Sequence, residues 1–289
     1  MGKSCKRLKK VVYLHKNIIM VKYVIHLADI HIRTFRLHDE YQEVFRTLLV
    51  QINDLAKDYK REEIRIVLAG DLVHQKIVIS NEQLVLGTWL LRSFENIAPL
   101  IVIAGNHDLL ENNKDRMDSI SPMVQFLPDT NINYFKESKC YQDDNIVWCV
   151  YSIFEQNKKP DIDSARKEFG NDKTYIGLYH APLINAKTDI GFEIDHGAGL
   201  DIFEGCDMVM LGDIHKRQSF NHKGIIIAYP SSLIQQNFGE NVSNHGFLFW
   251  DVETKTYTEH NVENKHVYYN FKIKSLDDLE NNKELITNL

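Results

Sequence analysis

Residues 99–108 read PLIVIAGNHD, an apolar run that ends in four small or polar residues. The first six residues have the apolar, β-branched composition of a buried strand. A plain turn does not require a glycine, an asparagine, a histidine and an aspartate in that order, so the ending indicates chemistry rather than a simple connection. The stretch therefore predicts a strand whose C-terminal end carries part of a functional site, with Asn106 and His107 as candidate residues.

Two earlier strands are predicted to end in the same way. Val24–Ala28 leads into Asp29-Ile30-His31, and Ile64–Ala69 leads into Gly70-Asp71. The order is β-α-β-α-β with polar residues after every strand, and in open α/β sheets ligands bind at that edge. Two segments between the strands are predicted to be helical: residues 39–59 and 81–97.

The second half of the chain changes character. The charged segments 111–119 and 156–173 are interpreted as loops. We predict an α/β fold in four layers, α-β-β-α, in which two packed mixed sheets are flanked by helices. Short strand-like segments follow one another with little helix between them: residues 145–153, 174–179, 208–211, 225–229 and 246–251.

The chain is divided into three parts. Residues 1–19 form a basic N-terminal tail that we expect to be dispensable, with Met20 as an alternative start. Residues 20–262 form the main domain. Residues 263–289 are interpreted as the start of a C-terminal cap segment whose completeness is left open. This segment is predicted to contain a strand and a helix: Tyr268–Ile273 and Leu276–Ile286.

Composition restricts the class of protein. The chain has 289 residues and a formal net charge of -6, which argues against wholesale coating of nucleic acid through a basic surface. Bound metal cations could still supply positive charge locally. No apolar run is long enough to cross a bilayer, and His15 and Lys16 interrupt the stretch that a signal peptide needs. We therefore expect an intracellular protein, cytoplasmic or nuclear.

Four cysteines without a C-x-x-C pair are expected to be free thiols: Cys5, Cys140, Cys149 and Cys206.

Five segments supply oxygen or imidazole donors, and each follows an apolar, strand-like run. Each segment alone has an ordinary explanation, as a strand-end pair, a turn or a core histidine. All five together make coincidence improbable, because such donors bind divalent cations. Two cations roughly 3.5–4 Å apart can clamp the attacking and leaving oxygens of a phosphoryl displacement. The segments are Asp29-x-His31, Gly70-Asp71, Gly105-Asn106-His107-Asp108, Tyr179-His180 and Gly212-Asp213-x-His215.

The order of these segments resembles the calcineurin-like metallophosphoesterases over roughly residues 23–251. The resemblance implies the metallophosphoesterase sandwich and two metal ions. It implies that Asp29, His31, Asp71 and His215 hold one metal, and that Asp71 bridges to a second metal held by Asn106, His180 and Asp213. His107 is then the proton donor or transition-state stabiliser. The family usually has histidine in place of Asp213; a carboxylate can still ligate, and the alternative is that it points away and leaves one site weak.

Further motifs resemble the SbcD and meiotic-recombination-eleven DNA repair nucleases, including phage and large-virus members. The resemblance implies that His74 is a second active-site histidine; the alternative is a helix-capping or solvated histidine. It also implies a manganese- or magnesium-dependent exonuclease and endonuclease that processes DNA ends, a homodimer, and a coiled-coil ABC-type ATPase partner. The motifs are Leu27–Arg33 followed by His38–Tyr41, Asp71-Leu-Val-His74, Gly212–Lys216, Tyr229-Pro-Ser-Ser232, Asn237-Phe-Gly-Glu240 and Gly246–Trp250.

Two other functions are left open. A metallophosphoesterase with the same fold and metals could act on phosphoproteins, cyclic nucleotides or dinucleoside polyphosphates. A non-catalytic binding subunit would be signalled by lost ligands, and only Asp213 departs from the family pattern.

Overall fold

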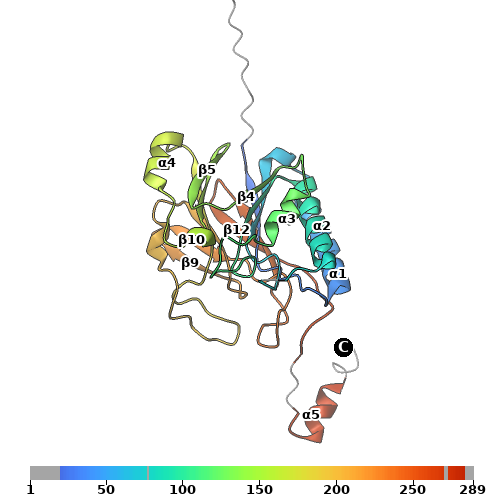
Figure 1. Cartoon of the computed structure of the whole chain (residues 1–289). Coiled ribbons are helices and arrows are strands. Elements are labelled where there is room, and N and C mark those ends of the chain that lie inside the picture. Colours follow the sequence, from blue (N-terminus) through green and yellow to red (C-terminus); the bar gives the residue numbers. More distant parts are fainter. Residues whose placement is uncertain (1–19, 77, 270–272, 284–289) are drawn as a thin grey trace, which may run out of the picture.

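The computed structural model describes residues 20–76, 78–269 and 273–283, and it contains two six-stranded sheets (Figure 1). The first sheet has the order β12-β11-β1-β2-β3-β4, and the second has the order β5-β6-β7-β8-β10-β9. The strands of the first sheet are β1 (Tyr23–Leu27), β2 (Ile64–Ala69), β3 (Leu100–Ile103), β4 (Ile132–Phe135), β11 (Gly246–Asp251) and β12 (Thr256–Asn261). Those of the second are β5 (Lys139–Asp143), β6 (Ile146–Tyr151), β7 (Thr174–His180), β8 (Met208–Gly212), β9 (Gln218–His222) and β10 (Ile225–Tyr229).

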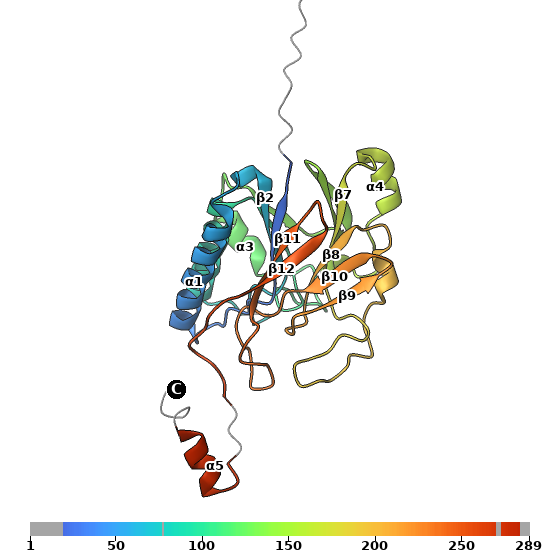
Figure 2. The ribbon, with the colours of Figure 1, turned by 180° about the vertical axis from the view of Figure 1, so that it is seen from behind.

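Helices cover the outer faces of both sheets. Helices α1 (His38–Ala56), α2 (Asn81–Ile97) and α3 (Ile120–Gln125) lie on the outer side of the first sheet (Figure 1). Helix α4 (Ile162–Phe169) lies on the opposite side, as the view from behind also shows (Figure 2). The predicted α/β sandwich of two helix-flanked mixed sheets is therefore confirmed. A short helix, α5 (Leu276–Asn281), follows β12. The described residues also contain 3-10 turns at Arg61–Glu63, Ile153–Glu155 and Leu200–Phe203.

The apolar pattern of β2 explains the layering. Ile64, Ile66 and Leu68 pack into the core between the first sheet and its helices. Val67 and Ala69 point to the other face and pack into the core between the two sheets. Successive side chains of a strand alternate between faces, so an uninterrupted apolar run is what a strand buried on both sides requires. The neighbouring strands β1 and β3 pair with β2 in parallel.

The two long helices lie close to their predicted positions. Helix α2 begins with a capping box, in which the Ser80 hydroxyl accepts from the Gln83 amide at 3.1 Å and the Gln83 side chain accepts from the Ser80 amide at 3.4 Å. Helix α1 ends at Ala56, three residues before the predicted end. Its apolar face is buried, and Leu55 beside this face is half-buried. The buried residues are Tyr41, Val44, Phe45, Leu48 and Ile52.

Other predictions were wrong or fall outside the described residues. Segment 156–173 contains a helix, α4, which begins where the Asp161 carboxylate accepts from the Ser164 amide at 3.0 Å. It was missed because only Ile162 and Ala165 of its eight residues are buried. No strand forms at residues 268–269, while residues 270–272 and the tail 1–19 lie outside the described part of the chain. The predicted helix from Leu276 ends at Asn281.

Two further predictions concern membrane-spanning segments and the cysteines. Within the described residues, no helix combines the length and the apolar composition needed to cross a membrane. Cys140, Cys149 and Cys206 are free, as expected, and all three are buried. Cys5 lies outside the described residues.

A buried ion pair joins the two sheets. Arg65 of β2 is 5% exposed, and its guanidinium donates to the Asp143 carboxylate of β5 at 2.8 and 2.6 Å. We expect Arg65→Ala to lower the free energy of unfolding by about 3 kcal/mol, because it leaves a partly buried carboxylate without its partner. Urea unfolding of this variant beside Arg46→Ala, an exposed position on α1, measures the difference. A loss below about 1 kcal/mol for Arg65→Ala would show that the pair does not hold the sheets together.

Candidate functional site

The predicted donor residues meet where the central strands of both sheets end. Strands β1, β2 and β3 run parallel in one sheet, and β6, β7 and β8 run parallel in the other. Because the carboxyl ends of parallel strands share one edge, the loops that follow them come together. All the predicted site residues lie in or beside this cluster: Asp29, His31, Asp71, His74, Asn106, His107, His180, Asp213 and His215.

A first group of donors surrounds the ring of His31. Its Nε2 atom lies 2.9 Å from Nε2 of His215, 3.5 Å from Oδ2 of Asp71 and 3.9 Å from Oδ1 of Asp29. Ligand atoms about 2.1 Å from one cation and at right angles to each other are about 3 Å apart. The separations in this group therefore fit a shared metal ion.

A second group surrounds the ring of His180. Its Nε2 atom lies 3.3 Å from Oδ1 of Asn106, 3.4 Å from Oδ1 of Asp71 and 3.9 Å from Oδ1 of Asp213. Asp71 thus presents Oδ2 to the first group and Oδ1 to the second, which is the position of a bridging carboxylate. Its side chain is 2% exposed.

Asp29 and Asp213 lie between the two groups. Asp29 is close enough to share a cation with His31 and His215, or with Asp71 and His180. The backbone amide of Asp213 donates to both Asp29 oxygens at 3.1 Å. The Asp213 carboxylate faces His180 and is 20% exposed. This geometry differs from the alternative in which Asp213 points away from the site.

Four residues of the site have a strained, left-handed backbone conformation. Asp29, His31, Asp71 and Asp213 have φ angles of 54°, 52°, 56° and 97°, in the left-handed region that costs an L-residue about 1–2 kcal/mol. Such conformations persist at functional sites where the surrounding structure enforces them. Here the loops after β1 and β2 remain paired, because the amides of Asp29 and His31 donate to the carbonyls of Gly70 and Asp71.

Hydrogen bonds also orient the histidines. Nδ1 of His180 donates to the Ala69 carbonyl at 2.7 Å, and Nδ1 of His215 donates to Glu240 Oε1 at 2.8 Å. Each ring therefore turns the lone pair of its Nε2 atom toward the donor group, which is the arrangement of a metal-binding histidine. The sequence motif that ends in Glu240 was recognised without a role for this residue, and its carboxylate now has one.

Asp108 links two loops of the site through hydrogen bonds. This fully buried carboxylate accepts from the amides of Asp71 and Gly105 at 2.8 Å and of Val73 at 3.1 Å. It thereby ties the loop after β3 to the loop after β2. The sequence pattern contained Asp108, but nothing in it indicated which amides the carboxylate would accept from.

Two glycines of these motifs are required for steric reasons. A Cβ atom on Gly105 would lie 2.1 Å from Oδ1 of Asp71 and 2.6 Å from Nε2 of His180. A Cβ atom on Gly212 would lie 2.6 Å from Nδ1 of His180. Both glycines therefore make room for the His180 ring between the sheets.

The electrostatics of the site favour a bound cation. Burial raises the pKa of Asp29 to about 7, although His180 and His215 oppose this shift. Burial also raises the pKa of Asp213. At Asp71 burial acts in the same direction, but the charge and hydrogen bond of His180 outweigh it and lower the pKa well below its usual range. A divalent cation stabilises ionised carboxylates and neutral imidazoles, so the buried donor set fits one.

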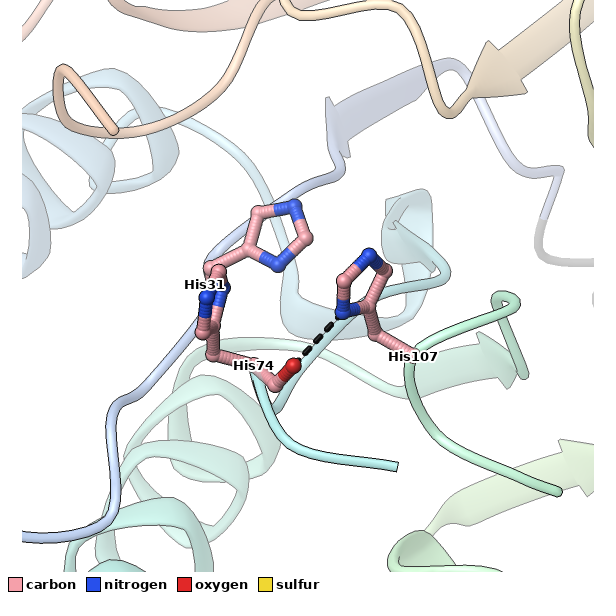
Figure 3. Close-up of side chains that lie close together, drawn as sticks. All are labelled: His31, His74 and His107. Atoms are coloured by element: carbon pink, nitrogen blue, oxygen red, sulfur yellow. Dashed lines mark hydrogen bonds between the residues drawn. The ribbon is translucent and has the colours of Figure 1, made fainter. Parts of the chain in front are cut away.

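A third group consists of His31, His74 and His107, whose rings lie close together (Figure 3). The rings of His74 and His107 are stacked, and the ring of His31 is edge-on to both. Nδ1 of His107 donates to the His74 carbonyl at 2.6 Å, and the His107 amide donates to Asp71 Oδ1 at 2.8 Å. Burial, together with the charges of Arg33 and His107, lowers the pKa of His74 to about 4, so its ring is neutral at pH 7. His107 is thus held beside Asp71 by both its ring and its backbone amide.

Glu240→Gln is expected to weaken metal binding by about 10–100-fold, because outer-sphere partners of metal-binding histidines have effects of that size. The amide keeps the shape of the side chain and removes the charge that orients His215. Titration with Mn²⁺ measures the change. Glu259→Gln, which alters an exposed carboxylate beside Arg217, serves as the control. Equal affinity in both variants would mean that Glu240 does not act through His215.

The fold and the clustered donors define a metal-dependent phosphoesterase. The model of the family described as calcineurin-like phosphoesterase matches residues 22–217. The chain belongs to the calcineurin-like phosphoesterase family, whose members are hydrolases that use divalent metal ions.

Comparison with individual proteins finds a viral relative. The chain is 40% identical over 263 residues to the uncharacterized protein R555 of Acanthamoeba polyphaga mimivirus; the match covers 88% of this chain and 19% of that protein. This chain therefore spans about a fifth of the length of the relative it matches.

Similar solved structures include the NAD nucleotidase of Haemophilus influenzae, with 10% identity and a TM-score of 0.45 over 92% of this chain and 56% of that one. They also include an archaeal phosphodiesterase, with 14% identity and a TM-score of 0.40 over 82% of this chain and 97% of that one.

Proposed function

We propose that the chain is a manganese-dependent DNA nuclease of the SbcD and meiotic-recombination-eleven type, which hydrolyses phosphodiester bonds at DNA ends in double-strand-break repair or recombination. The observation that carries the proposal is the pair His74 and His107 beside Asp71. The Asp71-Leu-Val-His74 motif is one of the features that separates these nucleases from the wider family.

The metal ligands are assigned as two sets. Asp29, His31, Asp71 and His215 would hold one ion, and Asp71, Asn106, His180 and Asp213 would hold the other. When bound, divalent cations polarise the phosphoryl oxygens and lower the pKa of water. Four of these seven side chains donate through oxygen, which suits manganese or magnesium.

The protein's own groups orient the substrate and move the proton. Asp29, Asp71 and His180 are almost fully buried, whereas the side chains of Asp213 and His215 are 20% and 25% exposed. A phosphodiester therefore approaches from the side of Asp213 and His215. Nε2 of His107 stabilises charge on the phosphoryl oxygens and, when protonated, delivers a proton to the leaving 3′ oxygen. The neutral His74 holds His107 in position through its carbonyl.

The proposed partners are DNA ends, a second copy of the chain and a coiled-coil ABC-type ATPase. Helices α1 and α2 are the proposed dimer surface, and they expose Val50, Val85 and Trp89 by 61%, 69% and 37%. Exposed apolar side chains on adjacent helices are typical of interaction surfaces. Sedimentation at micromolar concentration that shows only monomer would contradict the dimer.

The second candidate function is hydrolysis of another phosphoester, because the fold and the donor groups are common to both. Purified protein with Mn²⁺ is tested on linear DNA, a phosphopeptide, a cyclic nucleotide and a dinucleoside polyphosphate. The proposal expects DNA to be the preferred substrate by kcat/KM. Rapid hydrolysis of one of the other three, with intact DNA, would replace the nuclease function by that activity.

A further inference from the structure

A groove of about 340 Å³ opens beside the donor groups. Its floor contains Asp213 and His215, and its walls are two loops, residues 187–193 and 237–240. Both loops project from the same edge of the molecule, below β9 and β10 in Figure 1 and again in Figure 2. The groove is therefore continuous with the site at which the phosphodiester is expected to lie.

The first wall is a rigid hairpin. The amide of Thr188 donates to the Phe192 carbonyl at 2.9 Å, and the amide of Gly191 donates back to the Thr188 carbonyl at 2.9 Å. Gly191 has a φ angle of 84°, as expected for the left-handed position of a three-residue hairpin loop. Ile190 lies within this loop and Phe192 at its end, and both line the groove.

The second wall is fixed by Asn237 and linked to the first. The Asn237 side chain accepts from the Gly239 amide at 2.8 Å and donates to Glu240 Oε1 at 2.8 Å. The Asn241 side chain donates to Asp189 Oδ1 at 2.8 Å, which ties the two loops together. The groove is thus held at a defined width before any ligand enters.

Large apolar side chains are exposed around this groove. Ile190 is 77% exposed, and Phe192 and Phe238 are each 58% exposed. Phe238 rests edge-on against Tyr268 at a ring distance of 4.9 Å, so its position is supported. Exposed apolar groups that gather next to a functional site mark a surface for a ligand.

The polar groups of the groove are already engaged within the loops. Asn237 makes the two hydrogen bonds given above, and the Thr188 hydroxyl accepts from the Phe192 amide at 3.2 Å. The walls therefore offer an aromatic and an aliphatic surface rather than a pattern of donors and acceptors. Surfaces of this kind bind nucleobases through stacking, with little dependence on sequence. Lys216 at the same groove adds a cation near the expected phosphate.

We propose that this groove holds one unpaired nucleobase of the DNA strand that is cleaved, stacked on Phe192 and packed against Ile190. The inference rests on the proposed nuclease function and assigns a base-binding site to the loop residues beside the donor groups. The volume lies near the lower limit for sites that bind small ligands, which admits one nucleoside-sized group.

The test removes the base and the ring separately. A series of single-stranded oligonucleotides is prepared, each with one abasic site at a different position around the cleaved bond. The full-length protein with Mn²⁺ is assayed on each of them. One abasic position is expected to lower kcat/KM by about tenfold, and Phe192→Ala is expected to lower it by about tenfold on intact DNA. On the oligonucleotide with that abasic position the variant should cause no further loss, because both changes remove one contact. Phe126→Ala, at an exposed phenylalanine outside the groove, should behave as wild type.

A second readout needs no catalysis. An oligonucleotide with 2-aminopurine at the sensitive position is mixed with protein in EDTA, and its fluorescence should be quenched by wild type and by Phe126→Ala but not by Phe192→Ala. If wild type cleaves DNA while abasic sites and Phe192→Ala have effects below twofold, the groove does not hold a base and the nuclease function stands. An equal loss for Phe192→Ala on intact and abasic DNA would also overturn the inference. If wild type hydrolyses a small phosphoester and no DNA, the proposed function itself fails.

Discussion

His107→Ala is expected to lower the rate of DNA hydrolysis by about 10²–10³-fold, the usual effect of removing one transition-state donor. His107 lies next to Asn106 in sequence, but its ring belongs to the third group, where Nδ1 donates to the His74 carbonyl. Its amide, which the substitution retains, is the group that contacts Asp71. The loss should therefore fall on kcat, with metal content and thermal stability nearly unchanged.

The controls separate catalysis from metal binding. Elemental analysis of His107→Ala should give the same metal content as wild type. His74→Ala should cause a smaller loss than His107→Ala, because the main contribution of His74 is a backbone carbonyl that alanine retains. Turnover of His107→Ala within a few fold of wild type would contradict the role assigned to this ring.

Asp213→Ala is expected to remove the second metal ion and to lower activity by more than about 10²-fold, beyond the effect of outer-sphere changes. The Asp213 carboxylate lies 3.9 Å from His180 and is one of three side chains grouped around that ring. Alanine retains the amide that donates to Asp29. The first donor group should therefore still bind its ion.

Asp213→His is the matched variant, and it should be tolerated. Asp29, Asp71 and Asp213 place three negative charges against the four positive charges of two divalent ions, whereas the histidine variant has two. An imidazole donor favours zinc more than a carboxylate does, so zinc affinity should rise. The more cationic site should make bound water more acidic and lower the pH at which activity begins.

Metal content and kcat, measured together, test the predictions for Asp213→Ala and Asp213→His. Elemental analysis after loading with Mn²⁺ or Zn²⁺, alongside kcat, is carried out on wild type and both variants. Two bound ions and normal turnover in Asp213→Ala would mean that Asp213 is not a ligand. Its match to the sequence motif would then not reflect a role in metal binding.

The sequence predicted the fold and the location of the site because both follow from local rules. Apolar runs such as Ile64–Ala69 identified strands that are buried on both faces, and the donors after them were predicted to meet at one sheet edge. Even Asp213, which departs from the family pattern, lies at that edge. Asp29, Asp71 and His107 each follow a predicted strand directly, and this position was enough to predict that they lie close together.

The features that the sequence did not predict depend on tertiary contacts. Glu240 reaches His215 across 25 residues of chain, and no local pattern specifies that pairing. Helix α4 is short and mostly polar, so its apolar signal is carried by only two buried residues. Ile190 and Phe192 read as ordinary apolar residues of a loop, and their exposure beside the site emerges only when the hairpin is placed against residues 237–240.

The central claim is that Asp71 bridges two metal ions, and electron paramagnetic resonance of the Mn²⁺-loaded protein tests it most directly. Two manganese ions about 3.5–4 Å apart and joined by one carboxylate are expected to be exchange-coupled. Wild type should bind two Mn²⁺ per chain and give a coupled spectrum, and Asp71→Asn should lose both the coupling and activity on DNA. A six-line spectrum from isolated Mn²⁺ in the fully loaded, active wild-type protein would contradict the account.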